Sequence, residues 1–477
     1  MTEKRDSRPN GVPRKAAKPK GIIVETHAER HAAGKALRQG CPRESHGAWK
    51  APAGRPDPVH LVLEADKGRL PSLLPLRHGR MVHTPFTFYR GSALAMVADL
   101  ASTPSTGVRV QCCGDAHLSN FGVFDIPGRK VIFSVNDLDE TLPAPWEWDV
   151  KRLATSFVVA SRNNRLSEAA ATDSAITCVR SYRKSMAKFS QMTTLALWNH
   201  VLWADALVAG IKDHSLRLRA MKGLRKGAAQ GVAQDLFPKL AEGGAGLPVI
   251  EDKLPTIFHA EGFPPGKIHK VVLDTLARYR ATLPHAMQSL LGRYELLDAA
   301  MKVVGVGSVG TSCWVVLFMA GRDDLLFMQV KEARASVLEP YAGKSAFDNH
   351  GERVINGYRL MQPVSDMFLG WTEAAVEGRP HFYIRQLRDL KIEIPVESFR
   401  SSEMELYATW CAKALALSHA RSGSSAQLSG YMGNSDAFDR AIGAFAIKYA
   451  DQNEEDHAAL KRAVRKGQVK AVVEKGK

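Results

Sequence analysis

The sequence has few cysteines and no apolar run long enough to cross a membrane. Six of its 477 residues are cysteine and none forms a Cys-x-x-Cys pair, so neither a zinc site nor a disulfide framework is predicted, and a reducing cytoplasm is the expected compartment. No stretch reaches the roughly 18 apolar residues of a transmembrane helix. The basic N-terminal segment is not followed by the apolar core of a secretory signal. We therefore expect no membrane partner.

Acidic residues are in short supply relative to basic ones. The chain holds 49 Asp and Glu against 65 Lys and Arg, a formal net charge of +16. Such a balance favours anionic partners, which include nucleic acid and phosphorylated small molecules. Arg90, just before a predicted helix, is a candidate contact for phosphate or an acidic substrate, with a structural ion pair as the alternative. Much of the excess charge lies at the two chain ends, so nucleic acid is possible but not favoured.

Composition changes along the chain indicate four segments. Residues 1–58 are rich in Pro, Gly, Lys and Arg, which predicts a flexible basic arm. Residues 59–300 combine two short strands with long helical stretches, and residues 301–400 are rich in β-branched residues. Residues 401–477 predict further helices and a basic tail. The predicted fold class is therefore α+β.

Polar side chains gather between two strongly apolar strands in the first half of the chain. The loop Gly-Asp-Ala-His-Leu-Ser-Asn contains Asp115, His117 and Asn120. The strand Lys-Val-Ile-Phe-Ser-Val then ends in Asn-Asp-Leu-Asp-Glu, which contains Asp137 and Asp139. Phosphoryl transfer requires such a set, because one carboxylate orients the acceptor hydroxyl while an amide and a second carboxylate hold a divalent metal. Asn120 and Asp137 offer the oxygen ligands that Mg²⁺ prefers.

This series of motifs, continued by Trp-Asp-Val-Lys-Arg-Leu-Ala, resembles the catalytic half of aminoglycoside and choline phosphotransferases and, more distantly, of protein kinases. The resemblance implies a catalytic base at Asp115, metal ligands at Asn120, Asp137 and Asp139, and loop-bracing side chains at His117 and Asp149. Cys113 departs from the pattern, since phosphotransferases usually carry His there. Over roughly residues 75–455 the chain also resembles a bacterial family of uncharacterised proteins with this signature, which implies no activity.

A glycine-rich turn lies in the second half of the chain, at residues 305–311. An apolar, β-branched stretch follows it and no helix does, which favours the hairpin loop of kinases over a dinucleotide fingerprint. The kinase pattern adds a lysine on the next strand, Lys331, and a glutamate on the following helix. Glu352 is the best candidate, with Glu332 and Glu339 as alternatives. The predicted nucleotide-binding residues are Gly305, Gly307, Ser308, Gly310, Thr311, Lys331 and Glu352.

The order of these parts differs from that of a kinase. Asp115 precedes Gly305 by 190 residues, whereas a kinase glycine loop precedes its catalytic loop. We therefore expect a two-lobed, protein-kinase-like fold in circularly permuted order, with a helical catalytic lobe at residues 59–300 before a β-rich nucleotide-binding lobe at residues 301–400. The backbone of residues 386–388 would follow the last strand of that lobe and meet adenine.

Together these patterns predict an ATP- and Mg²⁺-dependent phosphotransferase that acts on a hydroxyl of an unidentified small molecule or protein, with Asp115 and Lys331 as catalytic residues. Three alternatives stay open. A kinase-like enzyme would transfer AMP instead of phosphate. A metal-dependent phosphoesterase would use Asp115, His117, Asp137 and Asp139 as ligands. A non-catalytic protein would bind nucleotide or nucleic acid.

Overall fold

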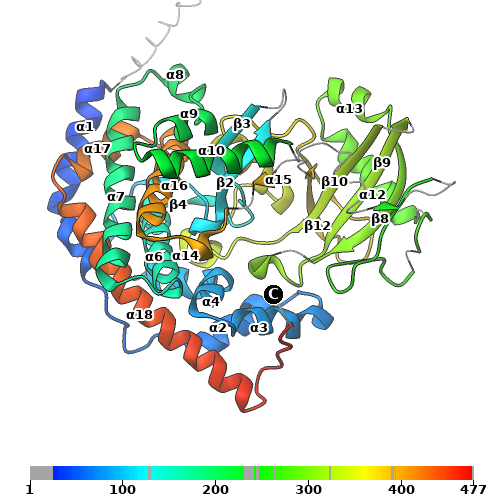
Figure 1. The fold of residues 1–477 in the computed structure, drawn as a ribbon, viewed down its shortest axis with the longest axis horizontal. Helices are drawn as coiled ribbons and strands as arrows, with labels where there is room; N and C mark the ends of the chain where they lie inside the picture. The colour runs from blue at the N-terminus through cyan, green and yellow to red at the C-terminus, as the bar shows by residue number, and fades with distance from the viewer. Residues whose placement is uncertain are drawn as a thin grey trace, which may run out of the picture.

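The computed structural model joins a helical part to a six-stranded antiparallel sheet (Figure 1). It describes residues 25–126, 130–229, 241–242, 247–262, 264–267, 269–303, 305–321, 324–387, 391–392 and 394–474. The fold class is α+β, as the sequence predicts. Within these ranges, no helix combines the length and apolarity needed to span a membrane.

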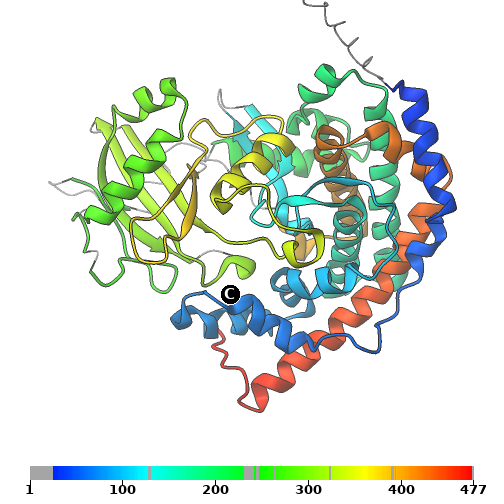
Figure 2. The same ribbon diagram turned by 180° about the vertical axis from the view of Figure 1, so that it is seen from behind.

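Four long helices form the centre of the helical part, namely α6 (Trp146–Asn163), α7 (Glu168–Ser190), α16 (Ser401–Ser422) and α18 (Ala437–Arg465). The first three pack against one another, and α18 crosses α6 and α7. Smaller helices surround them: α1 (His27–Ala36), α2 (Pro58–Asp66), α3 (Leu74–Met81), α4 (Pro85–Gly91), α5 (Ala93–Leu100), α8 (Thr194–Trp198), α9 (Ala204–Ala209), α10 (His214–Ala229) and α17 (Ser425–Met432). Figure 2 shows α1 and α18 along the outer edge of this part.

Two small sheets position the polar loops of the helical part. They are formed by β1 (Arg109–Cys112) with β4 (Leu142–Pro145), and by β13 (Lys391–Ile392), β2 (Phe121–Ile126) and β3 (Lys130–Val135). The β2–β3 hairpin pairs Phe121 with Val135, so the start of β2 lies opposite the end of β3. The backbone amide of Asn136 donates to the carbonyl of Asn120 at 2.7 Å. The hairpin therefore brings the Asp115–Asn120 loop beside the acidic segment that follows β3.

The large sheet has the order β11–β12–β10–β9–β8–β7. Its strands are β7 (Ile257–Phe258), β8 (Glu295–Lys302), β9 (Cys313–Gly321), β10 (Asp324–Ala333), β11 (Gly370–Glu373) and β12 (His381–Gln386), with β5 (Ala241–Glu242) and β6 (Val249–Ile250) as a separate pair. The helices of this region are α12 (Lys270–Ala281), α13 (His285–Leu291), α14 (Glu339–Ala342) and α15 (His350–Met361). α15 packs on β10, β11 and β12 and also on α16, so it joins the sheet to the helical part.

The N-terminal segment differs from the predicted flexible arm over residues 1–58. Residues 1–24 lie outside the described residues, but α1 begins at His27 behind a capping box formed by Thr26 and packs on α17. Gly34 and Gly430 allow this close packing, because a Cβ at either would collide with the backbone of the other helix. The composition of this segment predicted a flexible arm. The helix α1 forms instead because its glycine-bearing face packs closely against α17.

His46, in the same segment, gives stability a predictable pH dependence. It is 1% exposed, its Nε2 lies 2.7 Å from the Tyr431 hydroxyl, and burial lowers its pKa to about 3. In the unfolded chain His46 is protonated below about pH 6.5, whereas in the folded chain it stays neutral until the pH approaches 3. Its contribution to the free energy of unfolding is therefore complete above pH 6.5 and is lost as the pH falls towards 3. Between pH 7 and pH 5 we expect a loss of about 2 kcal/mol. Urea unfolding at both pH values should show a shallower pH dependence for His46→Gln, and equal slopes would contradict the assignment.

Candidate functional site

The loop between β1 and β2 is closed by its own hydrogen bonds. The His117 amide and the Asn120 side-chain Nδ2 both donate to the Asp115 carbonyl, at 2.8 and 2.9 Å, and the Asn120 amide donates to the His117 carbonyl at 2.8 Å. Nδ2 is used in this way, and Oδ1 of Asn120 accepts no hydrogen bond within the described residues. Asn120 can therefore offer an oxygen ligand without loss of a loop contact.

The carboxylate of Asp115 has one engaged and one free oxygen. Arg152, on α6, donates to Oδ1 through Nε at 2.7 Å and through Nη2. Oδ2 accepts no hydrogen bond within the described part of the chain, and His117 Nε2 lies 3.8 Å from it. The side chain is 18% exposed. Asp115 can therefore accept a proton at Oδ2 while Arg152 holds its orientation.

His117 is buried beside Asp115 and does not brace the loop through its ring. The side chain is 3% exposed, and its Nδ1 has no hydrogen-bond partner among the described residues. Burial lowers its pKa to about 4, so the ring is neutral near pH 7. Only the backbone of His117 takes part in closing the loop, through its bonds to Asp115 and Asn120.

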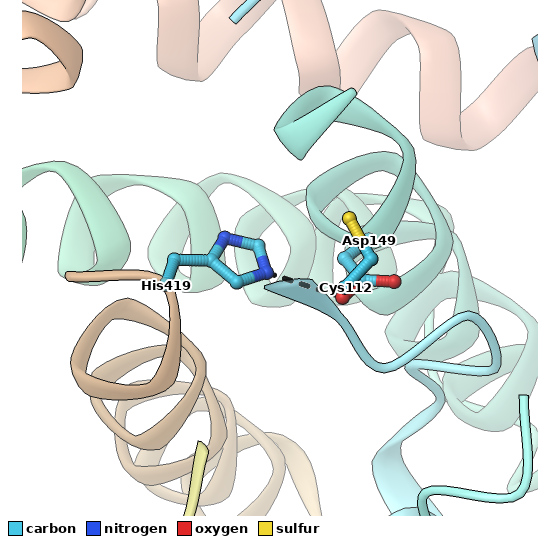
Figure 3. Close-up of side chains that lie close together, drawn as sticks. All are labelled: Cys112, Asp149 and His419. Atoms are coloured by element: carbon cyan, nitrogen blue, oxygen red, sulfur yellow. Dashed lines mark hydrogen bonds and ion pairs between the residues drawn. The ribbon is translucent and has the colours of Figure 1, made fainter. Parts of the chain in front are cut away.

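Asp149, in the first turn of α6, binds the backbone of the loop and also contacts His419, as Figure 3 shows for the histidine. Its Oδ2 accepts from the Cys113 amide at 2.6 Å and from His419 Nε2 at 3.1 Å, while Oδ1 accepts from the Gly114 amide at 3.1 Å. Cys112 lies close enough that Cys112, Asp149 and His419 together could surround a metal ion. Their hydrogen bonds to protein groups, including Cys112 Sγ to the Ala144 carbonyl, instead fit a structural brace of the kind predicted for Asp149.

Lys331, on β10, reaches the acidic segment that follows β3. Its Nζ lies 3.6 Å from Asp137 Oδ2 and forms a close ion pair with Asp139 Oδ2. Asp139 also accepts from the Tyr383 hydroxyl at 2.7 Å. The lysine is 4% exposed, whereas the carboxylates of Asp137 and Asp139 are 37% and 25% exposed. The structure thus joins the two predicted constellations at one place, with Asp137 the more open to solvent.

The ionisation of this cluster follows from its geometry. Burial acts to raise the pKa of Asp137, but the nearby cations Lys331 and Arg385 outweigh it and hold the pKa well below its usual range. Burial and the charge of Asp137 raise the pKa of Asp139. Burial lowers the pKa of Lys331, yet the two carboxylates outweigh it and the pKa is raised. Asp137 is therefore the group most firmly held as an anion.

The predicted glycine loop lies over the Asp115 loop. It connects β8 to β9, which pair as an antiparallel hairpin, and contains the predicted residues Gly305, Gly307, Ser308, Gly310 and Thr311. A Cβ at Gly307 would lie 4.0 Å from Asp115 Oδ2, and the Ser308 hydroxyl donates to Asp139 Oδ2 at 3.4 Å. Arg69 Nη1 donates to the Val309 carbonyl at 2.7 Å from the segment between α2 and α3. The absence of a following α-helix is typical of a hairpin loop and not of a dinucleotide fingerprint.

Glu352 is not the partner of Lys331 in this structure. It lies in the first turn of α15, and no ion pair joins it to the lysine among the described residues. The neighbouring Arg353 reaches the site instead and donates to the carbonyls of Thr141 and Asp139, at 2.6 and 2.8 Å. The lysine is already neutralised by the acidic segment, so the helix contributes a cation that fixes the segment's backbone.

The backbone amides predicted to meet adenine are partly engaged. The Gln386 amide donates to Asp366, and the Leu387 amide donates to the Phe327 carbonyl at 2.9 Å. Arg388 lies outside the described residues. These two N–H groups are therefore not free for a base in this conformation.

Besides Arg353, sequence reasoning missed two further cations of the site, Arg152 and Arg385. Arg152 lies three residues after Asp149 on α6, a spacing that places both on the same helix face. Arg385 alternates with Tyr383 along β12, so both side chains lie on one face of the sheet. Arg385 donates to Gln329 Oε1 at 3.0 Å and to the Tyr358 hydroxyl at 3.2 Å. Both spacings can be read from the sequence. Only the fold shows that these faces of α6 and β12 are the ones turned towards the acidic residues of the site.

Comparison with known proteins gives a family and no activity. No curated protein matches the chain. No solved structure matches it either. One family model matches residues 69–463, which include the Asp115 loop, Lys331 and the helices around them. The chain therefore belongs to the family described as uncharacterised protein conserved in bacteria (DUF2252).

Proposed function

We propose that this protein is an ATP- and Mg²⁺-dependent phosphotransferase on a kinase-like fold whose two lobes occur in permuted order. The observation that carries the proposal is the 3.6 Å approach of Lys331 Nζ to Asp137 Oδ2. The two residues come from opposite halves of the chain, and sequence motifs alone had assigned them to one phosphate site. Two accidental motif matches would have no reason to meet.

The arrangement of strands supports the kinase-like part of the proposal. In chain order, β8, the glycine loop, β9, the lysine strand β10, α15, β11 and β12 form one unit. This is the sequence of parts that a kinase nucleotide lobe uses, with a glycine loop over the phosphates and a lysine on the third strand. The helical part with the Asp115 loop precedes it in this chain. A permuted connection is compatible with the same packing, because it changes only where the chain is joined.

The donor set fits a divalent metal with hard oxygen ligands. Asn120 Oδ1 and the open carboxylate of Asp137 would hold Mg²⁺. The ion would supply charge neutralisation of the polyphosphate. Asp139 takes a different role from the predicted metal ligand, since Lys331 and Tyr383 occupy its oxygens. It positions the lysine that would bind the phosphates, as the helix glutamate does in the kinase pattern.

A group of the chain itself, Asp115, can take up the proton of the acceptor hydroxyl. An acceptor hydroxyl donates its proton to Asp115 Oδ2 as its oxygen forms a bond to the γ-phosphorus of ATP. The bond from that phosphorus to the β–γ bridging oxygen breaks, and ADP leaves with the electron pair. Arg152 keeps Oδ1 occupied, so the proton arrives at Oδ2, the oxygen that lies beside Gly307.

Replacing Asp115 with asparagine tests the proposed base. We expect ATP turnover to fall by about 100-fold or more, because general-base catalysis contributes on this scale, while nucleotide affinity stays nearly unchanged. Turnover is followed by ³¹P NMR of full-length protein with MgATP, and Asp348→Asn, at an exposed position, is the matched control.

The products separate the proposal from its alternatives. ADP formation with a Mg²⁺ requirement supports phosphoryl transfer, whereas AMP attached to protein, seen by intact mass, would establish AMP transfer. Unchanged turnover in Asp115→Asn would contradict the role of this residue. Turnover that survives Lys331→Met but needs Mn²⁺ or Zn²⁺ would establish a phosphoesterase instead.

A further inference from the structure

Three arginines meet at α4, two of them buried and one, Arg90, partly exposed, and Arg90 has no anionic partner. Arg77 pairs with Asp66 at 2.8 Å, and Arg152 pairs with Asp115. Arg90, on α4, forms no ion pair or hydrogen bond through its guanidinium among the described residues, and its Nε is buried without a partner. Burial lowers its pKa. The side chain is partly exposed, and its Cζ lies 5.8 Å from the centroid of the Phe86 ring. A buried N–H donor without an acceptor is nevertheless costly, so the Nε atom of Arg90 requires an explanation.

The backbone around Arg90 is held rigidly. Arg152 Nη2 donates to the Tyr89 carbonyl at 3.1 Å, and Arg77 Nη2 donates to the Gly91 carbonyl at 2.9 Å. The two paired arginines thus fix the residues on both sides of the unpaired one. The Arg90 side chain therefore starts from a fixed point of the fold and is partly open to solvent, where it can meet a ligand.

That fixed point lies beside the free oxygen of Asp115. A Cβ at Gly307 would lie 3.3 Å from the Arg90 carbonyl and 4.0 Å from Asp115 Oδ2, so both residues flank the same glycine. Two further polar atoms of the Asp115 loop are buried without partners, His117 Nδ1 and Ser119 Oγ. The carboxylates that act on the charge of Arg90 are those of Glu397 and Asp115, and neither pairs with it.

We infer that the acceptor carries an anionic group, a phosphate or a carboxylate, which Arg90 binds next to the hydroxyl held by Asp115. The inference rests on the proposed function. A planar guanidinium suits either anion, because its N–H groups match paired oxygens. The Ser119 hydroxyl is available as a further donor. The missing partner of the third arginine is thus supplied by the substrate, and the same contact sets the substrate class.

A competing assignment is that Arg90 binds the γ-phosphate of ATP. The two assignments differ in one measurable respect. An acceptor subsite stays open when a non-hydrolysable ATP analogue fills the nucleotide site, whereas a γ-phosphate site is then occupied. Binding of a small anion in the presence and absence of the analogue therefore separates them.

Calorimetric titration with inorganic phosphate tests the inference on the full chain, at constant ionic strength and with saturating Mg²⁺ and AMP-PNP. We expect saturable binding to wild type and at least about tenfold weaker binding to Arg90→Met, the scale of a lost charged hydrogen bond. Arg90→Lys should fall between them, since it keeps the charge and loses the planar geometry. Arg293→Met, an exposed arginine, is the control and should bind like wild type. AMP-PNP affinity should be nearly equal in all four proteins, which also shows that the variants fold.

Three results would overturn the inference: no saturable phosphate binding to wild type, equal affinity in Arg90→Met, or competition between phosphate and AMP-PNP. A parallel titration with acetate identifies the anionic group of the acceptor. Tighter binding of acetate indicates an acceptor with a carboxylate, and tighter binding of phosphate indicates a phosphorylated acceptor. Absence of Mg²⁺-dependent AMP-PNP binding would defeat the proposed function instead. Arg90-dependent phosphate binding to nucleotide-free Lys331→Met would still support the anion site in that case.

Discussion

Replacing Asp137 with asparagine is expected to lower Mg²⁺-dependent affinity for ATP by about 100-fold or more, since loss of groups that only support metal ligands already costs 10- to 100-fold. The carboxylate is the most open acidic group of the site and is held ionised by Lys331 and Arg385. Asparagine keeps its size and removes its charge. Calorimetric titration with AMP-PNP, with Mg²⁺ and with EDTA, measures the effect, and the residual affinity in EDTA should resemble that of wild type.

Asp139→Asn is the matched comparison, two residues away in the same segment. Asp139 is occupied by Lys331 and Tyr383, so its loss should weaken nucleotide binding but leave the remaining binding dependent on Mg²⁺. The reverse pattern, with Mg²⁺ dependence lost in Asp139→Asn and kept in Asp137→Asn, would show that the two carboxylates have been assigned the wrong roles.

Replacing Asp149 with alanine is expected to lower the free energy of unfolding by about 3–5 kcal/mol, the cost of removing one partner from a buried charged network. The side chain is 2% exposed and accepts from two backbone amides and from His419. Without it, the amides of Cys113 and Gly114 lose their acceptors in the interior. Urea unfolding measures the loss.

Asp451→Ala is the control for this effect. Asp451, on α18, is 59% exposed and pairs with Arg162 at 2.8 Å, so its loss should cost less than about 1 kcal/mol. Equal effects of the two substitutions would contradict the view that Asp149 holds the loop. Asp149→Asn should lie between them, because it retains one acceptor oxygen.

The local parts of the site could be predicted because their signals are local. The glycine turn between two β-branched stretches fixes a hairpin, and Lys331 falls on the next strand as the spacing predicts. The strand β3 and the acidic segment after it were also found, since an apolar run followed by Asn and Asp marks a strand end. β2 (Phe121–Ile126) was missed, because no strand was predicted between the polar loop and the strand Lys-Val-Ile-Phe-Ser-Val.

The pairings within the site could not be predicted, since they depend on which faces meet in space. Asp137 and Asp139 are equivalent in sequence, and only the position of β10 shows that Lys331 lies closer to Asp139. Glu352 and Arg353 are neighbours on α15, and the helix orientation decides that the arginine enters the site. Charge counting likewise could not reveal that Arg152 is paired and Arg90 is not.

We propose that the phosphates of ATP bind at Lys331, where residues from the two halves of the chain meet. An acyl-phosphate derivative of ATP, which acylates a lysine near the bound phosphates, tests it directly when the labelled peptides are identified by mass spectrometry. We expect labelling of Lys331 that requires Mg²⁺, is prevented by excess ATP and is lost in Asp137→Asn. Labelling confined to other lysines, or labelling of Lys331 that ATP does not prevent, would contradict it.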